Sequence, residues 1–327
     1  MSEEMRSVIT GQAEQIRHSL EVNKDVRVEG EFDSIILSGM GGSGHPGDLL
    51  NALHVTKVPL TVHRSYGIPH AFGTKPLTII SSYSGNTEEA LSSYEEAKAA
   101  GKPMLVNTSG GKLLEWAKRD NIPTSLIDYP GMQPRHTLFA SFTGLATALA
   151  NSNLAEQLSE KFQQAADVID NEEERLEEPA KAVAQQLVGK TPIFYASDEM
   201  AFAAKNMKIQ TNENAKTAAF WNEFPELNHN EMVGMTHPQG AFHAVFLKTT
   251  SDSSHITDRM QITKQLYEEW GVGVTEVAVQ GTTLLDQLSY AVVFGLWLTY
   301  YLALAYDVDP IPVPGVENFK KRLQELH

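Results

Sequence analysis

Two stretches near the N-terminus decide the fold: "SIILSGMGGSGHPGD" (34–48) and "PLTIISSYSGNTEEA" (76–90). In each, a short apolar run ends at glycines and serines, and a run that favours a helix follows. This succession predicts a buried strand, a tight loop and a helix. Parallel strands end at the same edge of a sheet, so two such strands side by side would bring both loops together.

The same alternation continues along the whole chain and predicts the α/β class. A new helical pattern starts near "NSNLAEQ" (151–157), which suggests domains at residues 1–152 and 153–327, each a parallel sheet flanked by helices. Strands are expected at 34–39, 59–64, 76–83, 103–108, within 123–130, and at 191–197, 240–250 and 271–280. Helices are expected at 4–21, 45–54, 87–101, 135–150, 153–189, 199–214 and 253–271.

Composition excludes several classes of protein. The 327 residues include no cysteine, so there is no disulfide framework, thiol nucleophile or cysteine metal site. The net charge of −15 disfavours nucleic-acid and anionic-membrane partners. The histidines are scattered without ligand spacing, and we predict no metal and no cofactor. The apolar run 290–306 is too short for a membrane span, and it predicts a buried core helix. A cytoplasmic location fits these features.

The two loops also suggest a ligand. "GMGGSG" (39–44) matches the dinucleotide pattern, but the acidic residue expected after the next strand is missing. Arg64 follows that strand and could suit a 2′-phosphate, so this alternative stays open. The second loop reads S-x-S-G-x-T, with Ser82, Ser84 and Thr87 before a helix. Together with Gly42 and Ser43 of the first loop, these hydroxyls and helix amides predict a phosphate cradle without a fixed charge.

The two loops resemble the sugar isomerase (SIS) domain, which binds phosphosugars. Four further motifs narrow the resemblance to the bifunctional phosphoglucose/phosphomannose isomerase family: "QPRHTLF" (133–139), "NENAK" (212–216), "ELNHNE" (226–231) and "DPIPVPGVENFKKRL" (309–323). The resemblance covers nearly the whole chain, with its motifs in the family's order. It implies two SIS-type units, a homodimer, a phosphosugar substrate, and metal-free isomerisation between glucose 6-phosphate and fructose 6-phosphate.

The resemblance also assigns roles to residues. Glu213 matches the glutamate that moves the proton between C2 and C1, and His229 matches a histidine that opens the sugar ring from the neighbouring subunit. Arg135 is expected to stabilise the enediolate, since its charge persists at any working pH. Lys320 matches a lysine near the ring-opening step, although Lys321 follows it directly.

Two positions depart from the family pattern. His136 stands where a small apolar residue is expected after Arg135. Ile311 stands where the family commonly has threonine, and isoleucine is larger and cannot form a hydrogen bond. We therefore expect activity on mannose 6-phosphate to be affected more than activity on glucose 6-phosphate.

The residues alone leave alternatives open. The stretch 212–231 reads either as a solvated loop or as an acid/base centre, and Glu223, Glu226 and Glu231 compete with Glu213 for the role of base. A non-catalytic SIS protein that senses a phosphosugar would keep the serine loops and need no base. An isomerase acting on another phosphosugar, such as an amino sugar or a pentose, is a third possibility.

Overall fold

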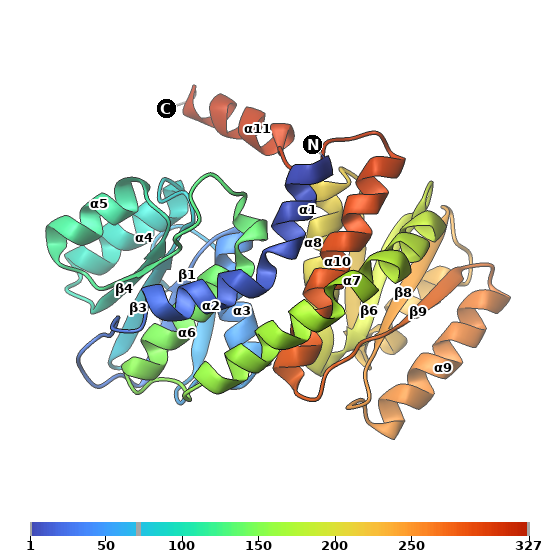
Figure 1. Ribbon diagram of the computed structural model, residues 1–327, viewed down its shortest axis with the longest axis horizontal. Coiled ribbons are helices and arrows are strands. Elements are labelled where there is room, and N and C mark those ends of the chain that lie inside the picture. Colours follow the sequence, from blue (N-terminus) through green and yellow to red (C-terminus); the bar gives the residue numbers. More distant parts are fainter. Residues whose placement is uncertain (1, 70–72, 326–327) are drawn as a thin grey trace. The chain divides into compact units, whose positions relative to one another are not determined.

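The computed structural model describes residues 2–69 and 73–325, and the chain forms two compact α/β units (Figure 1). The N-terminal unit comprises Gly11–Asp167. The C-terminal unit comprises the chain from Val168 onward together with the first helix, α1 (Ser2–Thr10). The helix α7 (Ser159–Leu187) begins in the first unit and ends in the second. The predicted domain boundary at residues 152 and 153 precedes α7 and stays a prediction.

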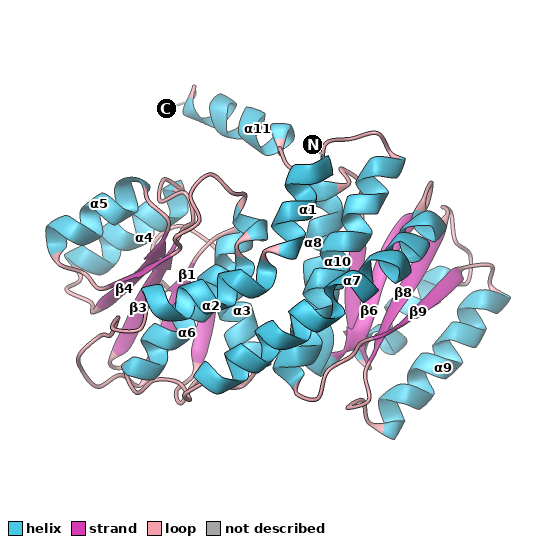
Figure 2. Ribbon diagram, viewed as in Figure 1, coloured by secondary structure: helices cyan, strands magenta, loops and turns pink. Residues whose placement is uncertain are grey.

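A five-stranded parallel sheet in the order β2-β1-β3-β4-β5 forms the centre of the N-terminal unit. Every residue of β1, β3 and β4 is buried, because helices cover both faces of the sheet (Figure 2). The strands are β1 (Ser34–Ser38), β2 (Leu60–His63), β3 (Pro76–Ser81), β4 (Met104–Thr108) and β5 (Thr124–Leu126). The helices are α2 (Gln12–Val22), α3 (His45–Ala52), α4 (Glu88–Ala99), α5 (Gly111–Asp120) and α6 (Leu138–Asn151).

The C-terminal unit has a four-stranded parallel sheet in the order β7-β6-β8-β9. The strands are β6 (Thr191–Ser197), β7 (Phe220–Phe224), β8 (Phe242–Lys248) and β9 (Gly273–Ala278). The helices that follow α7 are α8 (Ala201–Asn214), α9 (Ser254–Glu269), α10 (Leu284–Ala305) and α11 (Pro314–Gln324). The predicted fold class, two SIS-type α/β units with parallel sheets, is therefore confirmed.

The helix α10 is the core helix that the sequence predicts. It is long and apolar enough to cross a membrane, yet 83% of its most apolar 18-residue window is buried inside the protein. Thr283 caps its first turn: the Thr283 hydroxyl accepts from the Asp286 amide, and the Asp286 carboxylate accepts from the Thr283 amide. A span facing lipid would not be covered in this way, so α10 is a packing element.

Two local predictions need correction. The helix expected at 4–21 is two helices, α1 and α2, separated at Gly11 and assigned to different units. The stretch 212–231 is not a continuous loop, because it contains the end of α8, the strand β7 and two 3-10 turns, η4 (Glu226–His229) and η5 (Glu231–Met235). Its interpretation as an acid/base centre stays a prediction. β7 lies at the edge of its sheet, next to β6, and Phe220 is 54% exposed. The sequence does not predict this strand, because an edge strand need not have the continuous apolar run of a central strand.

Candidate active site

The two serine loops of the N-terminal unit lie against each other. β1 and β3 are neighbours in register, from Ser34 opposite Pro76 to Ser38 opposite Ile80, so both loops leave the same edge of the sheet. The Ser43 hydroxyl accepts from the Tyr83 amide at 3.0 Å. The Ser81 hydroxyl donates to the Ser43 carbonyl at 2.7 Å. These hydrogen bonds join the first loop, which forms the 3-10 turn η1 (Gly41–Gly44), to the second.

The second loop is shaped by its own hydroxyls. The buried Ser82 hydroxyl donates to Thr87 Oγ1 at 3.0 Å and accepts from the Gly85 amide at 3.1 Å. Ser84 is exposed, and its hydroxyl accepts from the Asn86 amide at 3.3 Å. Thr87 precedes the first turn of α4, and its side chain makes no capping hydrogen bond there. The amides at the start of α4 are thus available to an anion, as the predicted cradle requires.

Arg135 lies beside the first loop, although 92 residues separate it from Ser43. It belongs to the 3-10 turn η2 (Pro134–His136) and is only 3% exposed. A Cβ atom on Gly42 would lie 3.2 Å from the Arg135 backbone nitrogen, so a side chain at residue 42 would crowd this approach. The His136 carbonyl accepts from the Gln15 side chain at 2.8 Å, which fixes the turn to α2. The N-terminal unit therefore brings together the five predicted phosphate-binding residues and Arg135.

Glu213 occupies the last turn of α8 in the C-terminal unit and is half-buried. Its neighbours hold this end of the helix. The side-chain amide of the buried Asn214 donates to Thr299 Oγ1 at 2.9 Å, and the Asn212 side chain donates to the Thr217 carbonyl at 2.8 Å. Lys216 also folds back, and its ammonium donates to the Glu213 carbonyl at 2.6 Å. The backbone that carries Glu213 is therefore well fixed.

The other predicted residues of this unit lie on separate elements. His229 is exposed at the end of η4, and Lys320 and Lys321 are both exposed on α11. Exposure does not distinguish the two lysines. The structure gives each residue a place on the C-terminal unit, and the roles assigned to them stay predictions.

Comparison with known proteins adds the family. Residues 176–323 match the model of the bacterial phospho-glucose isomerase C-terminal SIS domain. A protein of Caldicellulosiruptor bescii named bifunctional phosphoglucose/phosphomannose isomerase is 36% identical over an alignment that covers 96% of this chain and 97% of that protein. This chain belongs to the bifunctional phosphoglucose/phosphomannose isomerase family. The resemblance read from the sequence is thereby confirmed.

One further relative has a different activity in its name, and one solved structure has a similar fold. A D-glucosamine-6-phosphate 4-epimerase of Sulfolobus acidocaldarius is 36% identical over 67% of this chain and 69% of that protein. The crystal structure of glucosamine-6-phosphate deaminase from Thermotoga maritima has a TM-score of 0.71 at 14% identity, covering 95% of this chain and 97% of that chain. At that identity the likeness concerns the fold alone.

The structure also bears on the dinucleotide alternative. The Arg64 guanidinium donates to both carboxylate oxygens of Asp48, each at 2.6 Å. The arginine considered for a 2′-phosphate is thus already engaged on α3, and the family match gives the glycine loop a different reading. Among the residues that the structure describes, no group of three histidine or acidic side chains is placed to hold a metal ion.

The competing carboxylates differ in their surroundings. Burial, together with the charges of Asp198 and Glu226, raises the pKa of Glu223. The Glu231 carboxylate accepts from the Tyr195 hydroxyl and from the Asn222 side-chain amide. Tyr195 and Asn222 did not emerge from the sequence, because a tyrosine in a buried strand and an asparagine in an unpredicted one carry no local sign of this contact.

Proposed function

We propose that this protein interconverts glucose 6-phosphate and fructose 6-phosphate by ring opening and proton transfer through an enediol. The observation that carries the proposal is the joined pair of serine loops with Arg135 beside them, in a chain of this family. The Ser43, Ser82, Ser84 and Thr87 side chains and the first amides of α4 would hold the sugar phosphate. Arg135 would oppose the charge that develops on the enediolate oxygens.

The proton movements then fall to the C-terminal unit. His229 exchanges a proton with the ring oxygen and the C1 hydroxyl, which gives the open-chain aldose, and Lys320 assists at this step. The Glu213 carboxylate takes the proton from C2, and an enediolate forms with its charge on O1. The proton of the C2 hydroxyl passes to O1, and Glu213 returns its own proton to C1, which gives the ketose and restores the carboxylate. We further propose a cytoplasmic homodimer in which His229 reaches the site of the neighbouring subunit, as the family resemblance implies.

The deciding experiment follows each sugar phosphate by proton NMR in D₂O, with chelator present. Wild type is expected to interconvert glucose 6-phosphate and fructose 6-phosphate and to introduce deuterium at C1 or C2. Glu213→Gln keeps the side-chain shape but cannot accept the proton, so turnover should fall by about 10²–10⁴-fold. Binding of a phosphosugar without turnover by wild type would instead support a sensor of the SIS type.

Two further substrates define the range of the site. Mannose 6-phosphate tests Ile311, which is half-buried and whose amide donates to the Asp309 carboxylate at 3.1 Å. We expect slower turnover of mannose 6-phosphate than of glucose 6-phosphate, because isoleucine offers no hydrogen bond to the substrate or to water. Glucosamine 6-phosphate tests the activity named for the Sulfolobus relative. A product inverted at C4 would show that epimerisation at C4, and not aldose–ketose isomerisation, is the main reaction.

A further inference from the structure

The segment that carries His229 is tied to the core of the C-terminal unit on both sides of the histidine. Two residues after it, the Glu231 carboxylate accepts from the Tyr195 hydroxyl with one oxygen and from the Asn222 amide with the other. One residue before it, the Asn228 side-chain amide donates to Thr263 Oγ1 on α9 at 2.8 Å. His229 itself is exposed. Its backbone is therefore held by the contacts of the residues on either side of it.

The anchor of the Glu231 contact is rigid. Tyr195 lies in β6 with no exposed surface, and its ring packs against Phe224, Phe246 and Tyr267. Its hydroxyl also lies 3.3 Å from the Tyr267 hydroxyl. Burial above all, and then the charges around it, raises the pKa of Tyr195, so this hydroxyl stays a proton donor at any working pH. A buried hydroxyl facing a carboxylate forms a strong hydrogen bond.

The turns themselves would not hold this shape alone. η4 and η5 are each one 3-10 turn, and such short turns have weaker hydrogen-bond geometry than an α-helix. Leu227 and Met235 insert into the same buried cluster as Tyr195 and fix the two ends of the segment. Between them, the Asn230 side chain donates to Glu226 Oε1 at 2.6 Å within the segment itself, whereas Glu231 ties the C-terminal side of the histidine to β6 and β7.

We propose that Glu231 is a positioning residue, held by Tyr195 and Asn222, that sets the place of the His229 imidazole for ring opening. The proposal rests on the proposed function, in which His229 acts on the sugar ring. It also gives the carboxylate that competed with Glu213 a different task. Glu231 acts through the backbone of the segment and touches no substrate.

The test compares the variants Glu231→Ala, Glu231→Gln and Tyr195→Phe with wild type. Misplacing a catalytic group by about 1 Å costs up to about 100-fold in rate. We therefore expect Glu231→Ala to lower kcat by about 10- to 100-fold with KM little changed, because the phosphate loops are untouched. Glu231→Gln keeps one acceptor oxygen and should lose less, and Tyr195→Phe should lie between Glu231→Gln and wild type.

A matched control is available in the same unit. The Tyr301 hydroxyl also donates to a carboxylate, that of Glu177, but this pair joins α10 to α7. Tyr301→Phe therefore removes the same kind of contact without touching the segment that carries His229. It should keep the kcat of wild type, and a loss equal to that of Tyr195→Phe would overturn the proposal.

A second readout separates positioning from general damage. In the background of His229→Asn, Glu231→Ala should cost no further activity, since there is no imidazole left to place. An equal loss in both backgrounds would overturn the proposal. If wild type turns over no sugar, the proposed function fails, and hydrogen exchange of amides 226–235 decides the positioning alone: faster exchange in Glu231→Ala than in Tyr301→Phe supports it, and unchanged exchange refutes it.

Discussion

At the scale of single residues, His243 shows how burial creates a dependence on pH. It lies in β8, almost fully buried, with Nε2 at 2.8 Å from Thr275 Oγ1 and Nδ1 at 3.3 Å from the Lys190 ammonium. Burial, and then the charge of Lys190, lowers the pKa of His243 from 6.5 to about 4. The folded protein therefore keeps this imidazole neutral over a range in which the unfolded chain protonates it.

The stability of the protein should consequently fall as the pH falls from 6.5 to about 4, because only the unfolded state gains the proton. The contribution of His243 to this loss is at most about 3 kcal/mol. Urea unfolding at pH 7, 5.5 and 4.5 measures it. His243→Gln should flatten the slope, while His237→Gln, at an exposed histidine, should not. An unchanged slope in His243→Gln would assign the pH dependence to other groups.

Gly85 is a residue of the second loop that no other amino acid can replace without distorting the backbone. Its φ angle is +64°, and a Cβ atom would lie 1.8 Å from the Gly110 carbonyl oxygen. An L-residue in this left-handed conformation is already strained, and here it would also collide with the backbone. The contact belongs to the loop that carries Ser82 and Ser84, so distortion would reach the proposed phosphate cradle.

Gly85→Ala should therefore lower stability by about 3 kcal/mol or more and abolish the stabilisation that a sugar phosphate gives wild type. Gly101→Ala is the matched control, since Gly101 has φ +61° but no atom within 4 Å of its Cβ position. It should cost about 1 kcal/mol and leave the ligand effect intact. Thermal unfolding with and without fructose 6-phosphate distinguishes the two. A ligand effect retained by Gly85→Ala would place the phosphate elsewhere.

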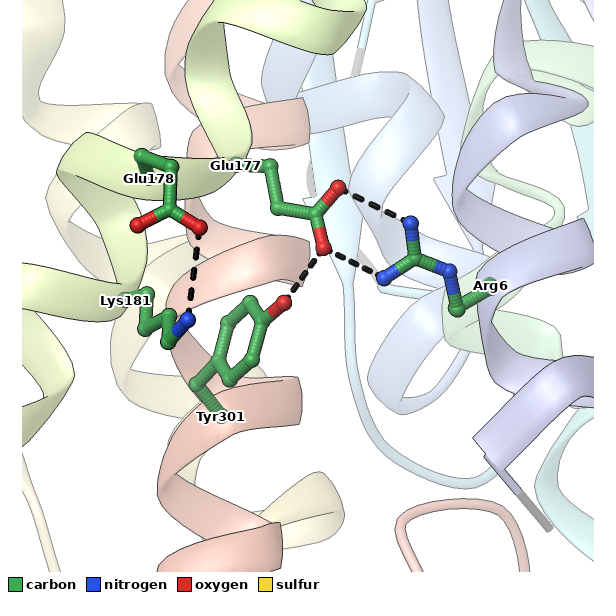
Figure 3. A network of polar contacts seen from close by, with 5 residues as sticks. All are labelled: Arg6, Glu177, Glu178, Lys181 and Tyr301. Atoms are coloured by element: carbon green, nitrogen blue, oxygen red, sulfur yellow. Dashed lines mark hydrogen bonds and ion pairs between the residues drawn. The ribbon is translucent and has the colours of Figure 1, made fainter.

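At the scale of elements, one polar network holds α1 in the C-terminal unit. The Glu177 carboxylate on α7 accepts from both terminal nitrogens of Arg6 on α1 and from the Tyr301 hydroxyl on α10 (Figure 3). The Arg6 guanidinium also lies 4.9 Å above the centre of the Trp297 ring. Chiefly because of the hydrogen bond from Arg6, the pKa of Glu177 is lowered.

Glu177→Gln should lower stability at neutral pH by about 1–2 kcal/mol, a value reduced because Arg6 is partly exposed to solvent. A lowered pKa means that the carboxylate stabilises the fold above its ordinary value of 4.5 and loses this effect as the pH falls through the folded value. The gap between wild type and variant should thus close in acid. Chemical unfolding at pH 7 and at pH 3 measures the gap, and a constant gap would contradict the ionic origin.

At the scale of the whole molecule, the proposed dimer makes a prediction that no single chain can show. Each site would take Glu213 from one subunit and His229 from the other, so Glu213→Gln and His229→Asn should each keep only a small residual activity alone. Mixed dimers of the two variants contain one intact site. Random exchange gives half mixed dimers, so about a quarter of wild-type activity should return. Activity that stays at the level of the separate variants would place both residues in one subunit or remove one from the mechanism.

The sequence by itself determined the strands of both sheet centres and the two serine loops. β1, β3 and β4 are short apolar runs bounded by turn residues, and their signal is local. The glycine and serine pattern after β1 and β3 could be read in the same way. Glu213, His229, Arg135 and Lys320 came from the family motifs, because the chemistry of a lone carboxylate or imidazole is not encoded by its neighbours.

Only the tertiary structure decided the features that depend on distant partners. β7 is a strand because β6 pairs with it. Its own residues, most of them at least partly exposed, do not show the apolar pattern that would predict a strand. The break at Gly11 assigns α1 and α2 to different units, although their apolar spacing continues across it. Arg135 reaches the Gly42 loop across the fold, and Tyr195 meets Glu231 from 36 residues away. Local pattern fixes which backbone forms, while packing between distant segments fixes which side chains meet.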